Sequence, residues 1–197
     1  WVLILMAIVL TSIIVWAVAP AFLRMNETVL GDNETPEAYQ FDLSNLSIDK
    51  AVLTPAMHHR NMSPVLTDPA LLSAQEIETV NKYQRSPFLV SKDLVVGIEI
   101  GGEARAYPFH MLHVHEIIND TLGGVPIVVS WHWPSGNVAV HKRTIHGEEV
   151  SFANSGLAGN GSLLMYPMQE TEGGEQLYSP ILGRSVTGQD VELEQVP

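Results

Sequence analysis

LVVGIEIGGEARAYPFHMLHVHEIINDTLGGVPIVVSW, residues 94–131, is the stretch that decides the fold of this chain. Its first part, 94–100, is rich in β-branched residues, and Gly101-Gly102 predicts a hairpin turn into a second strand over 104–107. A short helix is predicted over 109–118, where a proline suits the first turn. Paired glycines then lead into a strand of the buried type, so the stretch predicts a β-rich core with one short helix.

The same pattern of short strands and glycine turns continues towards the C-terminus. Further strands are predicted over 125–131, 137–143, 163–166 and 186–187. Upstream, Ser73 and Glu76 form a capping box that predicts the start of a helix. The fold class is therefore mostly β, a β-rich α+β domain that spans residues 57–197.

Residues 24–56 are polar and acidic and show little periodicity. They predict an extended acidic tether or a surface arm between the N-terminus and the domain. Five apolar residues within it could dock on a partner or on the domain itself: Tyr39, Phe41, Leu43, Leu46 and Ile48.

The N-terminal run WVLILMAIVLTSIIVWAVA, residues 1–19, contains no charged residue. At a rise of about 1.5 Å per residue it just crosses the ~30 Å hydrocarbon layer. A signal peptide has a shorter apolar region of ~7–15 residues, and apolarity on all faces favours lipid over a buried core helix. We therefore expect a single transmembrane helix over 1–23. The chain opens on Trp rather than Met, so we expect its natural start to be missing.

Three side chains in this run are candidate contacts with a membrane partner. Thr11 and Ser12 carry hydroxyls that could hydrogen-bond across to a neighbouring helix. Trp16, like Trp1, lies near one end of the run, where interfacial aromatic residues are found. We expect integral membrane proteins and the lipid bilayer to be the partners of this segment.

The charge balance excludes one class of partner and indicates a side of the membrane. Lys and Arg number 10 against 22 Asp and Glu, a net charge of −12, which argues against nucleic-acid binding because phosphate contacts need a basic surface. Only Arg24 and then acidic residues follow the apolar run, whereas cytoplasmic flanks are enriched in Lys and Arg. We therefore expect the domain to lie outside the cytoplasm, on the periplasmic or extracellular side.

Cysteine and asparagine usage add two constraints. The chain has no cysteine, which excludes disulfides, thiolate chemistry and Cys-ligated metals. In a source that glycosylates asparagine, Asn-x-Ser/Thr triplets would mark exposed loops. These triplets begin at Asn26, Asn33, Asn45, Asn61, Asn119 and Asn160.

Histidines are the residues that could carry metal chemistry. Six of the eight lie between residues 110 and 146, and imidazole is a common ligand of zinc and copper. His113, His115 and His132 are the candidate ligands. The spacing alone does not define a site, and these residues could equally be surface or hydrogen-bonded core histidines.

Catalytic patterns are weaker. The chain contains neither Gly-x-Ser-x-Gly nor His-Glu-x-x-His. His115 and Glu116 with Asp120 could form an acid–base pair, but Glu116 could equally form a structural salt bridge with Arg105. We assign no catalytic residue.

Several blocks resemble the signature motifs of domain-of-unknown-function family 3179. They include Gly102-Glu-Ala-Arg-Ala-Tyr-Pro108, His115-Glu-Ile-Ile-Asn-Asp120, Gly123-Gly-Val-Pro126 and Phe152-Ala-Asn-Ser-Gly-Leu157. The resemblance extends in order over roughly residues 60–195. It implies an exported or membrane-anchored protein and supplies no activity.

One departure from the family pattern bears on chemistry. Where the family usually carries Cys-Pro-Leu-Cys-Gly, this chain has His132-Trp-Pro-Ser135-Gly136. Both cysteines of the family motif are replaced in this chain. The resemblance therefore implies that a dithiol role would be lost. A metal role would fall to His132, with His115 as its neighbour. The scaffold blocks persist while this element changes, which favours a domain kept for binding or architecture.

We therefore expect a membrane-anchored accessory subunit of a larger membrane complex that has no catalytic role. The alternative is an extracytoplasmic domain that binds copper or zinc through His113, His115 and His132. An enzyme that uses His115 and Glu116 is a third hypothesis.

Overall fold

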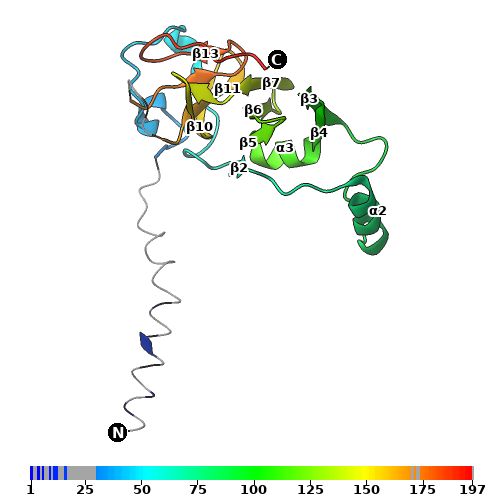
Figure 1. The fold of residues 1–197 in the computed structure, drawn as a ribbon. Helices are drawn as coiled ribbons and strands as arrows, with labels where there is room; N and C mark the ends of the chain where they lie inside the picture. The colour runs from blue at the N-terminus through cyan, green and yellow to red at the C-terminus, as the bar shows by residue number, and fades with distance from the viewer. Residues whose placement is uncertain are drawn as a thin grey trace.

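The computed structural model describes residues 1, 4, 6, 9, 11, 12, 16, 30–169, 171 and 174–196. Within these residues, the strands form two main sheets and two separate hairpins (Figure 1). The larger sheet has the strand order β1-β10-β11-β12-β13, and the smaller has the order β2-β5-β6-β7. The chain is thus β-rich with short helices, which confirms the fold class of the globular part.

The larger sheet is antiparallel throughout. Its strands are β1 (Leu53–Pro55), β10 (Phe152–Gly159), β11 (Ser162–Pro167), β12 (Tyr178–Ser179) and β13 (Arg184–Ser185). The strand predicted over 163–166 is confirmed by β11. The strand predicted over 186–187 is wrong by two residues, because the pairing with β12 uses Arg184 and Ser185.

The smaller sheet contains one parallel pair, β2 with β5. Its strands are β2 (Leu66–Thr67), β5 (Ile117–Leu122), β6 (Val125–His132) and β7 (Asn137–Lys142). β6 and β7 confirm the strands predicted over 125–131 and 137–143. β5 was expected in part as helix, because the predicted helix over 109–118 extends into it.

In the described part of the chain from residue 30 onwards, the remaining elements are two hairpins, two α-helices and two short 3₁₀ helices. They are η1 (Pro36–Tyr39), η2 (Lys50–Val52), α2 (Ala74–Tyr83), β3 (Val95–Ile100), β4 (Glu103–Pro108), α3 (Phe109–His115), β8 (Thr144–Ile145) and β9 (Glu148–Glu149). The hairpin predicted around Gly101-Gly102 is confirmed by the β3–β4 pairing. The Ser73–Glu76 capping box is also present at the start of α2.

Three clusters of buried side chains hold the layers together. The central one joins Ile117 and Val128 of the smaller sheet to Phe152 and Met165 of the larger sheet, so the two sheets pack face to face. A second cluster covers the other face of the smaller sheet with the β3–β4 hairpin and α3. Burial of apolar side chains on both faces of each sheet supplies the main driving force for folding.

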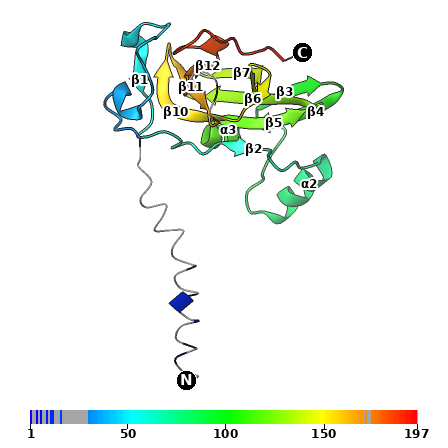
Figure 2. The ribbon, with the colours of Figure 1, turned by 60° about the vertical axis from the view of Figure 1, so that its left-hand side comes forward.

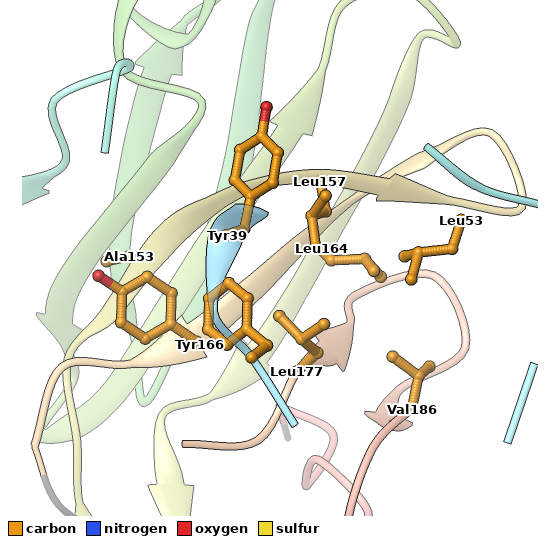
Figure 3. Close-up of a cluster of buried hydrophobic side chains, with 9 residues drawn as sticks. Tyr39, Leu53, Ala153, Leu157, Leu164, Tyr166, Leu177 and Val186 are labelled. Carbon is orange, nitrogen blue, oxygen red and sulfur yellow. The ribbon is translucent and has the colours of Figure 1, made fainter. Parts of the chain in front are cut away.

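The third cluster lies on the outer face of the larger sheet and contains part of the predicted tether (Figure 3). Tyr39 and Phe41 are 0% and 7% exposed and pack with Leu157, Leu164 and Tyr166. Leu43, Leu46 and Ile48 also pack against this cluster. Of the two possibilities left open by the sequence, these residues dock on the domain itself, so the domain includes residues 36–55 as well as the predicted span from 57.

A buried amide also ties the two sheets together. Asn119 on β5 is completely buried, and its side chain donates to the carbonyl of Phe152 at 2.9 Å and accepts from the N–H of Phe152 at 2.8 Å. The Asn119 triplet therefore does not mark an exposed loop, because the side chain replaces a strand-to-strand hydrogen bond inside the core.

Helix α2 lies apart from both sheets in the two views (Figures 1 and 2). All ten of its residues are described, and none is buried. The start of α2 is therefore set by its capping box and not by core packing. The Ser73 side chain accepts from the N–H of Glu76, and the Glu76 side chain accepts from the N–H of Ser73.

The predicted transmembrane helix over 1–23 lies largely outside the described residues. Thr11, Ser12 and Trp16 are described; all three are helical and exposed. In the part of the chain that is described, no helix is both long enough and apolar enough to cross a membrane.

Candidate functional site

Glu116 occupies the junction between α3 and β5, where the chain turns sharply. Its backbone has φ 53° and ψ −30°, a conformation that costs free energy for a residue with a Cβ. Its N–H donates to the carbonyl of Leu112 at 2.8 Å, and its carbonyl accepts from the N–H of Trp131 at 2.7 Å. The helix end and the neighbouring strand β6 thus hold Glu116 in this strained position.

The side chain of Glu116 is buried, with the whole residue 3% exposed. Its Oε2 accepts a hydrogen bond of 2.7 Å from the amide of Asn154 on β10. Burial raises the pKa of the Glu116 carboxyl to about 7, although the Asn154 hydrogen bond opposes that shift. Near neutral pH this carboxyl therefore exists in both protonation states.

Glu116 lines a cavity of about 490 Å³. One wall comes from the segment before β2, with Met57, His58, Met62 and Ser63, and the opposite wall comes from the end of α3. The hydroxyl of Ser63 donates to the carbonyl of Val114 at 2.8 Å, which ties the two walls together. We call this space the Glu116 cavity.

Trp133 also lines the Glu116 cavity, from the turn between β6 and β7. That turn is closed by His132 and Ser135, whose Nδ1 and Oγ lie 2.9 Å apart. Burial lowers the pKa of the His132 imidazole, while a hydrogen bond with the backbone of Gly161 opposes the shift. His132 and Ser135 stand where the family motif usually has its two cysteines. Here they form a hydrogen-bonded pair that positions Trp133.

The structure places the three predicted metal ligands in different surroundings. The ring of His113 lies 5.7 Å from that of Trp131, and the Nδ1 of His115 lies 2.6 Å from the carbonyl of Pro64. His132 faces Ser135 instead. Among the described residues, no three His, Cys, Asp or Glu side chains form a group that could hold a metal ion. Copper or zinc binding stays a prediction, which elemental analysis of the purified protein tests.

The alternative roles considered for Glu116 also find no matching contact. Arg105 pairs with Asp120 at 2.6 Å, not with Glu116. Asp120 also accepts a hydrogen bond of 2.9 Å from the hydroxyl of Tyr107. Burial and this hydrogen bond raise the pKa of Tyr107 well above its ordinary value. These charged and polar groups hold β4 against β5 inside the scaffold.

The sequence indicated Glu116 and His113 as candidate functional residues. It indicated no role for Trp133 of the cavity lining or for Asn154, which bonds to Glu116. Asn154 belongs to the Phe152–Leu157 block quoted above, and its role depends on β10 lying beside β5, which no local pattern predicts.

The fold and site together define a two-sheet β domain with a buried carboxyl at the base of an open cavity. A family model described as "Protein of unknown function (DUF3179)" matches residues 61–197, more than half of the chain, so the chain belongs to that family. No curated protein and no solved structure matches the chain.

Proposed function

We propose that this protein is a single-pass, membrane-anchored accessory subunit of a larger membrane protein complex. Residues 1–23 form the anchor, and the β domain lies on the extracytoplasmic face. The uncharged run over 1–19 supports the anchor, and the acidic flank that follows Arg24 supports the side of the membrane. The domain binds a partner subunit rather than carrying out a reaction.

The observation that carries this proposal is the apolar rim of the Glu116 cavity. Met62, Val114 and Trp133 are 49%, 57% and 64% exposed, and all three line that cavity. Single exposed apolar residues are ordinary, but several around one hollow are typical of a protein-binding surface. Trp is also among the residues that contribute most to binding energy at interfaces.

The polar residues of the family blocks support the same interpretation. Arg105 and Asp120 hold the hairpin to the smaller sheet, and Asn119 joins the two sheets. These residues therefore maintain the shape of the domain that presents the rim.

Deletion of residues 1–23 tests the proposal. We expect the deleted protein to leave the membrane fraction, because the apolar run supplies the bilayer affinity. We also expect it to separate from the chains that co-purify with the full-length protein in mild detergent. Full retention of the deleted protein in the membrane fraction and in the complex would contradict an anchor at 1–23.

A further inference from the structure

The floor and rim of the Glu116 cavity differ in character. The rim is apolar and exposed, as described above, whereas the floor carries a carboxyl group. Among the described residues that line the cavity there is no lysine and no arginine. The buried acid therefore has no cationic partner within the walls of the cavity.

The carboxyl has capacity for another contact. Its Oε2 accepts from Asn154, and within the described part of the chain its Oε1 has no hydrogen-bond partner. This oxygen is not among the buried polar atoms that lack a partner, so it is open to the cavity. A carboxylate has room for further donors at such an oxygen.

The arginine of the adjoining wall segment, Arg60, already has partners elsewhere. Arg60 donates to the carbonyl of Tyr39 and pairs with Glu175 at 2.8 Å, and its guanidinium lies over the ring of Phe41. It therefore serves the outer face of the larger sheet. A cation for Glu116 must come from outside the described walls.

We propose that the Glu116 cavity receives a lysine or arginine side chain of the partner subunit. The alkyl stem of such a side chain packs against Met62, Val114 and Trp133 while its charged end reaches Glu116. The net charge of −12 favours the approach of a basic surface. This inference rests on the proposed function, because it names the chemistry by which the accessory subunit recognises its partner.

A lysine mimic tests the chemistry on the full-length chain in detergent. The probe is Nα-acetyl-lysine N-methylamide, and the matched neutral compound is its Nε-acetylated form. We expect the probe to shift the Glu116 carboxyl resonance and to bind at least about tenfold more weakly to Glu116→Gln. Gln keeps an oxygen that can accept from Asn154. Equal binding of the neutral compound, no binding of the probe, or unchanged binding to Glu116→Gln would overturn the proposal.

Two further variants keep the test independent of folding defects at Glu116. Trp133→Ala changes an exposed turn residue and should also weaken the probe severalfold. Glu99→Gln removes the same charge from β3, where Glu99 is exposed and outside the cavity lining, and should bind the probe normally.

Purification from native membranes distinguishes the two proposals. We expect Glu116→Gln to lose the co-purifying chains that Glu99→Gln retains, with both variants still in the membrane fraction. If Glu116→Gln keeps those chains while deletion of 1–23 releases them, the cavity proposal fails and the accessory-subunit proposal stands. If the deletion releases nothing, the anchor proposal fails whatever the probe shows.

Discussion

Glu116 combines three costs that a folded domain usually avoids. Its backbone φ is positive, its carboxyl is buried, and within the described residues only Asn154 bonds to that carboxyl. Such a residue persists because the surrounding hydrogen bonds over-determine its position, and clusters of such costs are typical of functional sites. The helix predicted over 109–118 ends early for the same reason, since the Glu116 backbone turns the chain into β5.

The pH dependence of stability provides a test at this residue. Burial raises the pKa of Glu116 to about 7 in the folded protein, above the ordinary value of 4.5. The folded state therefore binds the proton more tightly than the unfolded state, and this residue lowers the free energy of unfolding as the pH rises from 5 to 8. Glu116→Gln has no carboxyl to ionise, so this position no longer lowers the free energy of unfolding as the pH rises.

Between pH 5 and pH 8, we expect the free energy of unfolding of Glu116→Gln to rise by about 2 kcal/mol relative to that of the wild type. Denaturant unfolding of the full chain at several pH values measures it. Glu99→Gln is the matched control and should follow the wild-type curve. Parallel curves for Glu116→Gln and the wild type would show that the carboxyl is not penalised by burial.

At the scale of elements, the structure that depends on neighbouring residues was predicted correctly, whereas the structure that depends on distant contacts was not. The β3–β4 hairpin was predictable because Gly101 and Gly102, with φ of 60° and 81°, form its turn. The start of α2 was predictable because Ser73 and Glu76 lie three residues apart. The stretch after Ser155 has the glycine-rich composition of an irregular connection, but it forms the buried end of β10 and the turn into β11. Its strand character depends on pairing with β1, about a hundred residues earlier in the chain.

Helix α2 allows the local contribution of a cap to be separated from global stability. Ser73→Ala removes the hydroxyl that accepts from the N–H of Glu76, which should cost the helix about 1 kcal/mol. Because none of the ten described residues of α2 is buried, we expect the global free energy of unfolding to change by less than about 0.5 kcal/mol. Amide exchange within α2 should become about fivefold faster.

Hydrogen-exchange mass spectrometry and denaturant unfolding together check this prediction. Ser91→Ala is the matched control, because Ser91 is exposed outside any helix or strand. A global loss as large as the local one would mean that α2 is coupled to the core.

At the scale of the whole molecule, the main difference from sequence expectation is the docking of residues 36–55. Their acidic, aperiodic composition resembles a tether, and only the few apolar residues within it carry the opposite signal. The segment docks through a contact between Tyr39 and Gly156, two residues that lie far apart in the sequence. Gly156 has φ 80°, and a Cβ there would lie 2.5 Å from the Cε1 of Tyr39, so the absence of a side chain at Gly156 makes room for the tyrosine ring. No pattern within either segment predicts that fit.

Replacement of Tyr39 distinguishes a core segment from a tether. The ring is completely buried in the cluster on the outer face of the larger sheet, and its hydroxyl donates to the carbonyl of Met57 (Figure 3). Tyr39→Ala should therefore lower the free energy of unfolding by about 3–4 kcal/mol through lost burial and the cavity left behind. Tyr83→Ala is the matched control, because Tyr83 on α2 is 78% exposed and should change stability by less than about 0.5 kcal/mol. Denaturant unfolding of both variants measures the contrast, and equal small effects would mean that residues 36–55 do not stabilise the domain.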